Sequence, residues 1–463
     1  MVFPTVQFAV FFPIVLALSW ALMRRQNVWK PFMLTASYIF YAAADPRFCL
    51  LLAGITLANQ LASKLIHASD DARVRKRIIT IIVGLDLGTL GVFKYYGFFA
   101  TEVNELLGSA GLGLPLPLAA IALPVGISFI TFQAISYSVD VYRGVLAPAS
   151  TIDVALYISF FSQLVAGPIV RAHEFLPQLQ GPRDPRKVAV GAAVALIIVG
   201  LVKKVAIADS LAREIVDPVF GVPQAYSAPD VWLASYAYAV QIFCDFSGYT
   251  DIAIGTALLL GFVFPQNFDR PYRSASLREF WRRWHITLSR FLRDFLYIPL
   301  GGNRGGKWRT VRNLMITMTL GGLWHGAAWG FVLWGVIHGT ALVVEHLLRG
   351  RISMPRWLGW LIAFHVVVLA WIPFRAPDLE LAATFASRLV EPGPATLWTV
   401  PVVLVTFLVI ALQLLPERPL DVIRVRFEQL HPVALGVSMA TAILLVAATV
   451  SNQGVPPFIY FQF

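Results

Sequence analysis

A densely basic segment of the chain reads Asp269-Arg-Pro-Tyr-Arg-Ser-Ala-Ser-Leu-Arg-Glu-Phe-Trp-Arg-Arg-Trp-His285. It continues through a glycine loop, Gly301-Gly-Asn-Arg-Gly-Gly306, and becomes apolar around one histidine in Gly321-Gly-Leu-Trp-His325-Gly326. Positive charge therefore lies at one end of the stretch, and a titratable ring lies in an apolar run at the other end. Residues 269–345 are predicted to be the functional centre around which the rest of the chain is organised.

Composition places the whole chain in a membrane. Of the 463 residues, 57% are hydrophobic and only 14% are charged, whereas about 25% are charged in an ordinary soluble domain. Lipid offers backbone N–H and C=O groups no partner outside a helix or a closed barrel, and the apolar runs lack the alternation of barrel strands. We therefore expect an all-α polytopic integral membrane protein with about eleven membrane helices, plus re-entrant and interfacial helices.

The net charge of +11 has a membrane explanation. Lys and Arg gather in cytoplasmic loops, where they face anionic lipid, so we expect membrane lipid and no nucleic acid among the partners. Basic clusters at residues 24–30 and 73–77 place those loops in the cytoplasm and the N-terminus outside. Residues 152–170 have positive charge on both sides, which predicts a re-entrant segment broken at Gly167-Pro168.

Apolar runs predict the other helices, and the lack of a cysteine framework, a repeat or a linker limits the domain organisation. Residues 78–99, 231–246 and 251–264 are predicted as separate helices, and residues 101–117, which lack Lys and Arg, as an outer loop. The two cysteines indicate neither a disulfide framework nor a metal site. No repeat or linker is visible, so residues 1–463 are expected to form one membrane domain with 269–345 as its central motif region.

A basic helix is predicted to start at Ser276. Ser276 followed by Glu279 is a capping-box pattern, and Phe280, Trp284 and Leu288 fall on one helix face opposite several arginines. This pattern describes a helix at the membrane interface, whose arginines could simply bind lipid headgroups. They could instead recognise a phosphate-bearing donor, because a guanidinium binds phosphate oxygens in pairs. The donor-binding residues predicted on this second interpretation are Arg282, Arg283, Arg304, Gly301, Gly302 and Asn303, with the glycine loop supplying backbone N–H groups.

His325 is the candidate catalytic base. An ionisable residue in an apolar membrane run is costly and is a functional hypothesis by default, and a neutral imidazole can accept a proton. Gly321 and Gly322 precede His325 on the same helix face, so we expect them to leave room for a thin acyl group. Together with Trp324 they are predicted to line a tunnel. The alternative is a core histidine bonded to a neighbouring carbonyl.

Further polar residues interrupt the apolar runs. For His338 and His365 we prefer the core interpretation, with a hydrogen bond to a nearby carbonyl. Asp245 and Asp251 lie close together in the sequence near a predicted helix break. We expect these two carboxylates to pair with arginines and hold the fold rather than to take part in chemistry.

Motifs along the whole chain resemble the membrane-bound O-acyltransferase family, and in particular its bacterial alginate O-acetyltransferase branch. The central ones are Phe280-Trp-Arg-Arg-Trp-His285, Tyr297-Ile-Pro-Leu-Gly-Gly-Asn-Arg304 and Gly322-Leu-Trp-His-Gly326. Others are Pro124-Val-Gly-Ile-Ser-Phe129, Asp140-Val-Tyr-Arg143, Gln163-Leu-Val-Ala-Gly-Pro168, Ser247-Gly-Tyr-Thr-Asp-Ile-Ala-Ile-Gly255, Pro265-Gln-Asn-Phe-Asp-Arg-Pro-Tyr272 and Phe458-Ile-Tyr-Phe-Gln-Phe463. One departure is Ser162, where the branch usually has proline, and it concerns a helix bend more than the chemistry.

The resemblance implies a ring of membrane helices around a central tunnel, in the bacterial inner membrane. It implies that His325 is the catalytic histidine and that His285 is a second active-site residue. It also implies acetyl-CoA as a cytosolic co-substrate, with no bound cofactor and no metal. The acceptor would be a polysaccharide hydroxyl or an extracytoplasmic SGNH-type acetyltransferase.

The function expected from these features is acetyl transfer across the membrane to an alginate-type exopolysaccharide. Within the enzyme class, the alternative is D-alanyl transfer to teichoic acid. In another class, a transporter of polysaccharide or lipid-linked sugar would also account for many helices and buried charges, but the absence of an internal repeat speaks against it. Which polymer is modified stays open at this stage.

Overall fold

The structure is a computed structural model that describes residues 1, 3, 5–112, 116–117, 121–164 and 167–449. These residues form helices and no strand, which confirms the all-α prediction. The C-terminal motif at 458–463 and two residues of the 163–168 motif lie outside the described part. The chain folds into two compact units, one of residues 1–190 with 253–265 and one of residues 191–252 with 266–463. The single domain over 1–463, its ring shape and its tunnel stay predictions.

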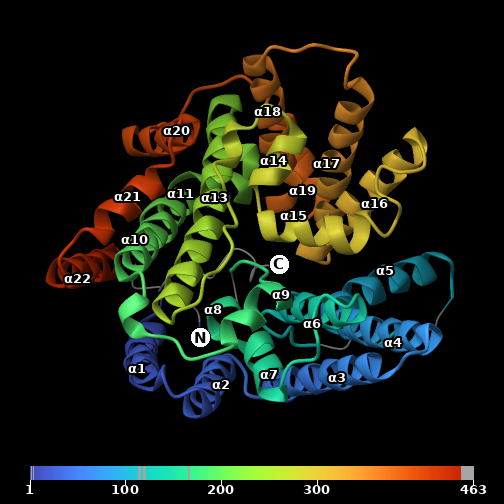
Figure 1. Cartoon of the computed structure of the whole chain (residues 1–463). Coiled ribbons are helices and arrows are strands. Elements are labelled where there is room, and N and C mark those ends of the chain that lie inside the picture. Colours follow the sequence, from blue (N-terminus) through green and yellow to red (C-terminus); the bar gives the residue numbers. More distant parts are fainter. Residues whose placement is uncertain (2, 4, 113–115, 118–120, 165–166, 450–463) are drawn as a thin grey trace. The chain divides into compact units, whose positions relative to one another are not determined.

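The first unit is built from the N-terminal helices (Figure 1). Asn59 donates a hydrogen bond to Asp86 at 3.0 Å inside this unit, and the Arg183 guanidinium lies 3.8 Å from the Trp29 ring and 4.3 Å from the Phe262 ring. Its helices are α1 (Val6–Leu22), α2 (Gln26–Ala42), α3 (Phe48–Ala68), α4 (Ala72–Leu90), α5 (Tyr96–Ser109), α6 (Ile127–Tyr142), α7 (Thr151–Ser159), α8 (Phe161–Leu164) and α9 (Ala172–Phe175).

The second unit holds the central motif region. Its helices are α10 (Val190–Leu201), α11 (Asp209–Leu211), α12 (Asp217–Gly221), most of α13 (Ala228–Leu259), α14 (Leu277–Arg283), α15 (Ile286–Leu292), α16 (Lys307–His325), α17 (Trp329–Leu348), α18 (Arg356–Arg375), α19 (Leu379–Arg388), α20 (Val400–Leu414), α21 (Pro419–Glu428) and α22 (Pro432–Thr449). Figure 1 draws α14 to α16 in yellow and α17 and α18 in orange.

Several helices of the described residues are suited to a membrane. Five are long and apolar enough to cross one, and a sixth is obtained if the bent pair Val400–Leu414 and Pro419–Glu428 is one span. The five are Phe48–Ala68, Ala72–Ser109, Val190–Gly221, Trp329–Leu348 and Arg356–Arg375. The membrane class is therefore confirmed, whereas the predicted number of about eleven membrane helices stays a prediction.

Glycines bring α16, α17 and α18 close together in the second unit. A Cβ on Gly322 of α16 would overlap the carbonyl oxygen of Phe331 on α17. In the same way, a Cβ on Gly335 would overlap the Met318 carbonyl oxygen, and one on Gly330 would overlap the Pro373 carbonyl oxygen. Small residues of this kind allow helix backbones to approach where lipid provides no hydrophobic force between helices. The result is a tightly packed frame around the end of α16, where His325 lies.

Some predicted boundaries were wrong. The separate helices at 231–246 and 251–264 form one helix, α13, because Gly248 is buried against Gly200 and does not end the helix; a Cβ on Gly248 would lie 2.8 Å from the Gly200 carbonyl oxygen. The predicted outer loop at 101–117 is helical as far as Ser109. The break in 152–170 comes earlier than predicted, at Phe160, where ψ is 113° and α7 has ended.

Candidate active site

His285 lies in a break between two helices of the basic segment. The predicted cap is present, since the Ser276 hydroxyl accepts a hydrogen bond from the Glu279 amide at 3.1 Å, and α14 starts there as expected. The helix then ends at Arg283 and restarts at Ile286, with His285 in the left-handed region at φ 41° and ψ 57°. The prediction of one helix face running through Trp284 to Leu288 was therefore wrong.

Asn267 explains why the helix breaks at this point. Its carbonyl accepts the Ile286 amide at 2.9 Å, and its side-chain oxygen accepts the Thr287 amide at 3.1 Å and the Thr287 hydroxyl at 2.8 Å. A left-handed backbone is unfavourable for a residue with a Cβ, so it persists only where neighbouring contacts enforce it. Three hydrogen bonds to the residues that follow His285 do so here.

The His285 imidazole is enclosed by aromatic rings. It is 0% exposed and lies 4.6 Å from the Phe246 ring and 5.9 Å from the Trp324 ring, measured between centroids. Burial lowers the pKa of His285 to about 3, so the ring is neutral. Neither ring nitrogen has a hydrogen-bond partner among the described residues, which is unusual for a buried polar group.

His325 is the last residue of α16 and is also buried, with 4% of its surface exposed. Three aromatic rings contact it edge to face: Trp324 and Trp334 at 5.0 Å and Phe374 at 5.2 Å. Trp324 contacts both His325 and His285. Both predicted catalytic histidines therefore lie against one tryptophan, although they are forty positions apart in the sequence.

The predicted tunnel-lining residues have different surroundings. Trp324 contacts both histidines. Gly322 faces the backbone of α17 with no free space, so the expectation that it leaves room for an acyl group was wrong. Gly321 faces Leu292 of α15, whose Cδ1 atom would lie 3.1 Å from an added Cβ. Both glycines allow neighbouring elements to pack closely, and the tunnel stays a prediction.

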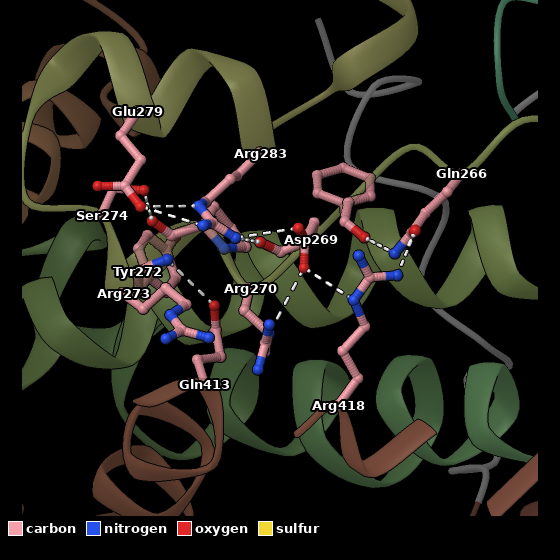
Figure 2. Close-up of polar contacts among 12 residues, drawn as sticks. Gln266, Asp269, Arg270, Tyr272, Arg273, Ser274, Glu279, Arg283, Gln413 and Arg418 are labelled. Atoms are coloured by element: carbon pink, nitrogen blue, oxygen red, sulfur yellow. Dashed lines mark hydrogen bonds and ion pairs between the residues drawn. The ribbon is translucent and has the colours of Figure 1, made fainter. Parts of the chain in front are cut away.

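Arg283 belongs to an ion-pair network that braces the basic segment. Its guanidinium lies 2.9 Å from Asp269 and 3.1 Å from Glu279. Asp269 also pairs with Arg418 at 3.0 Å, just before α21. Figure 2 shows Asp269 between the side chains of Arg283 and Arg418. These contacts give Arg283 a structural role within the segment.

A second group of arginines is less fully neutralised and lies where α14 meets the C-terminal end of α17. We call Arg278, Arg282 and Arg349 the arginine cluster. Partial burial, followed by the nearby charges of Arg349 and Arg282, lowers the pKa of Arg278. Glu345 accepts the Arg278 amide at 3.1 Å and lies 3.7 Å from Arg349. Of these arginines only Arg282 was predicted, because Arg349 meets α14 through the packing of helices distant in sequence.

Several backbone N–H and C=O groups of the glycine loop are already hydrogen-bonded within the protein. The amides of Gly301 and Gly302 donate to the carbonyls of Ile298 at 2.9 Å and Tyr297 at 2.8 Å. The Gly302 carbonyl accepts from Asn313 at 2.9 Å. Positive φ values at Gly301 and Gly302 explain why glycine occupies these positions. Asn303 and Arg304 are exposed, and their predicted role in donor binding stays a prediction.

The buried carboxylates of α13 are paired, but with lysines and not with the predicted arginines. Lys204 lies 2.6 Å from Asp245 and 2.7 Å from Asp209, and Lys203 lies 2.6 Å from Asp251. The predicted structural role agrees with these ion pairs. Within the described residues, no group of three or more His, Cys, Asp or Glu side chains is arranged to hold a metal ion.

Comparison with known proteins identifies one protein family and several relatives. The sequence profile of the membrane-bound O-acyltransferase family matches residues 138–372. The chain is 38% identical to the probable alginate O-acetylase AlgI of Azotobacter vinelandii, with 93% of this chain and 94% of that protein aligned. It is 45% identical to the protein of the same name in Pseudomonas aeruginosa, over 76% of this chain and 67% of the relative. Peptidoglycan O-acetyltransferase of Helicobacter pylori is 38% identical, over 76% and 72% of the two chains.

Proposed function

Because this chain belongs to the membrane-bound O-acyltransferase family, we propose that it transfers an acetyl group from cytosolic acetyl-CoA to a hydroxyl on the outer side of the membrane. The expected family and enzyme class are confirmed: the chain is an O-acyltransferase and a multi-pass protein of the bacterial inner membrane. The transporter alternative is therefore not supported. Relatives named for O-acetylation of alginate and of peptidoglycan favour a polysaccharide acceptor, reached directly or through an SGNH-type partner.

One observation carries the assignment of the reaction centre. His325 and His285 are both buried and both contact Trp324, and the α17 helix that contacts His325 ends at the arginine cluster. Two buried imidazoles, which could serve as a base and a hydrogen-bond donor, therefore lie within one helix length of a cationic surface. A phosphate-bearing thioester fits such an arrangement, because its anionic end can bind arginines while its acyl end reaches the histidines.

The proposed mechanism uses the two histidines differently. His325 accepts the proton of the acceptor hydroxyl as its oxygen attacks the thioester carbonyl carbon. His285, which is neutral, donates one N–H to the carbonyl oxygen, where negative charge develops. When the C–S bond breaks, the electron pair goes to sulfur and the thiolate takes the proton held by His325. The products are the O-acetyl ester and the free thiol, and both rings are again neutral.

Acetyl transfer by the purified protein in proteoliposomes tests this proposal. With labelled acetyl-CoA and unacetylated alginate oligosaccharide, with or without an SGNH-type acetyltransferase, we expect label on the acceptor that depends on both the protein and the donor. Transfer from a D-alanyl carrier protein, with none from acetyl-CoA, would instead assign the predicted alternative, D-alanyl transfer to teichoic acid.

The arginine cluster gives a prediction about donor binding. Removing the exposed charge of Arg282 (Arg282→Ala) is expected to raise the Kd for acetyl-CoA about fivefold, which corresponds to about 1 kcal/mol. The effect should shrink as salt is added, because salt screens exposed charges. Titration calorimetry in detergent at two salt concentrations measures both quantities.

Arg293 provides the matched control for that measurement. It is an exposed arginine of the same segment, but it pairs with its neighbour Asp294 at 2.6 Å. We expect Arg293→Ala to leave the Kd unchanged. Equal weakening by Arg282→Ala and Arg293→Ala would indicate a general effect of net charge, and an unchanged Kd for both would remove the cluster from donor binding.

A further inference from the structure

His338 is a buried histidine with no assigned role. It lies on α17, is 0% exposed, and neither of its ring nitrogens has a hydrogen-bond partner among the described residues. The expected bond to a neighbouring carbonyl is therefore absent. His365 does have this bond, to Leu361 at 2.8 Å, so that prediction was right for His365 and wrong for His338.

Two tryptophans share this unusual state. The ring of His338 lies 4.7 Å from Trp334 and 5.2 Å from Trp281, and the two indoles lie 5.6 Å apart. The indole nitrogens of Trp281 and Trp334 are likewise buried without a hydrogen-bond partner among the described residues. Leaving a buried polar atom without a partner typically costs about 1–3 kcal/mol. Several such atoms in one triangle of rings indicate a place that receives a hydrogen-bonding group.

The position of His338 along α17 indicates which group that is. Trp334 contacts His325 at 5.0 Å and His338 at 4.7 Å. His338 follows Trp334 by one helical turn, about 6 Å along the axis, toward Glu345 and the arginine cluster. His338 therefore lies between the candidate base and the surface that would hold the donor phosphates. A thioester arriving from that surface brings its sulfur atom to this side of the carbonyl.

We propose that His338 is a further catalytic residue that donates a hydrogen bond to the sulfur of the thioester as the C–S bond breaks. This inference rests on the proposed function, since it requires a thioester donor and His325 as base. The acceptor oxygen bonds to the carbonyl carbon and its proton passes to His325. The electron pair of the C–S bond goes to sulfur. The sulfur accepts a hydrogen bond from the N–H of His338 and then takes the proton held by His325. No other reactant is needed, and His338 is neutral throughout.

A change of leaving group separates this role from a structural one. His338→Phe removes both nitrogens and keeps a ring of similar shape, which a site lined by Phe280, Trp281 and Trp334 can hold. With S-acetyl pantetheine, whose thiolate is a poor leaving group, we expect single-turnover transfer to slow about 10²-fold. With S-acetyl thiophenol, whose more acidic thiol leaves readily, we expect the variant to come within about threefold of the wild type.

Two further variants sharpen the result. His338→Gln keeps an N–H donor and should recover much of the rate with S-acetyl pantetheine. His365→Phe removes a histidine that is already hydrogen-bonded, and it should not change the ratio of the two rates. An equal loss of rate with both thioesters, or no loss with either, would overturn the role of His338. Absence of transfer by the wild-type protein would count against the proposed function instead, so the two failures are distinguishable.

Discussion

Replacing His325 with alanine is expected to lower the rate of acetyl transfer by at least about 10³-fold, because the variant loses the group that accepts the hydroxyl proton. The side chains that surround His325 cannot take over its role as a base. His325 is held by Trp324, Trp334 and Phe374 at 5.0 to 5.2 Å, and these rings offer no other base. The measurement is the single-turnover rate of transfer from acetyl-CoA in proteoliposomes.

A second substitution guards against simple loss of folding. His325→Ala leaves space among three aromatic rings, which costs stability, whereas His325→Gln fills most of the volume and cannot act as a base of similar strength. Both variants should lose transfer, and His325→Gln should keep the elution profile and thermal unfolding temperature of the wild type. A folded His325→Gln protein that transfers acetyl groups at the wild-type rate would remove this histidine from the chemistry.

Replacing His285 is expected to cost about 10²-fold in rate, since one donor to a developing oxyanion typically contributes this much. His285→Gly is the informative variant. The left-handed backbone at φ 41° is unfavourable for histidine and readily adopted by glycine, so relief of this strain offsets part of the stability lost to the cavity that the ring leaves. The rate of transfer and the free energy of unfolding should be measured on the same preparation. A loss of rate without a matching loss of stability is the expected result.

His285→Asn provides the comparison. Asparagine tolerates a left-handed backbone better than most residues and retains an N–H donor on a shorter side chain. We expect partial activity from this variant, between that of the wild type and that of His285→Gly. If His285→Gly were as active as the wild type, the imidazole would have only a packing role beside Phe246 and Trp324.

Much of the local structure could be predicted from neighbouring residues. Ser276 with Glu279 predicted the start of α14 because both partners of the cap lie within one turn. The apolar run before His325 predicted the helix that carries it. In each case the physical cause lies within a few residues of the element, where a sequence pattern can reveal it.

Other features depend on contacts between distant residues and could not be predicted in this way. The helix break at His285 is enforced by Asn267, which lies outside the helix that it interrupts. A helix break was predicted between residues 246 and 251, but the helix continues there, and Gly248 allows the close approach of Gly200. Gly322 suggested an open space beside His325, but the backbone of α17 fills it.

The arginines illustrate the same limit within one segment. Eleven Lys and Arg side chains between residues 270 and 312 cannot be ranked by composition alone. The structure separates them by their partners: Arg283 is neutralised by Asp269 and Glu279, whereas Arg282 lies exposed beside Arg278. Helix packing also adds Arg349, which is outside the segment altogether.

In the proposed reaction, a buried histidine receives a thioester from one side of the membrane and a hydroxyl from the other. Sealed proteoliposomes with labelled acetyl-CoA outside and acceptor oligosaccharide inside, together with the SGNH-type partner if it is required, test this claim most directly. We predict label on the enclosed acceptor with the wild-type protein and none with His325→Gln, while the CoA moiety stays outside. Labelled acceptor at equal rates in both preparations, or acceptor modified only on the donor side, would contradict the account.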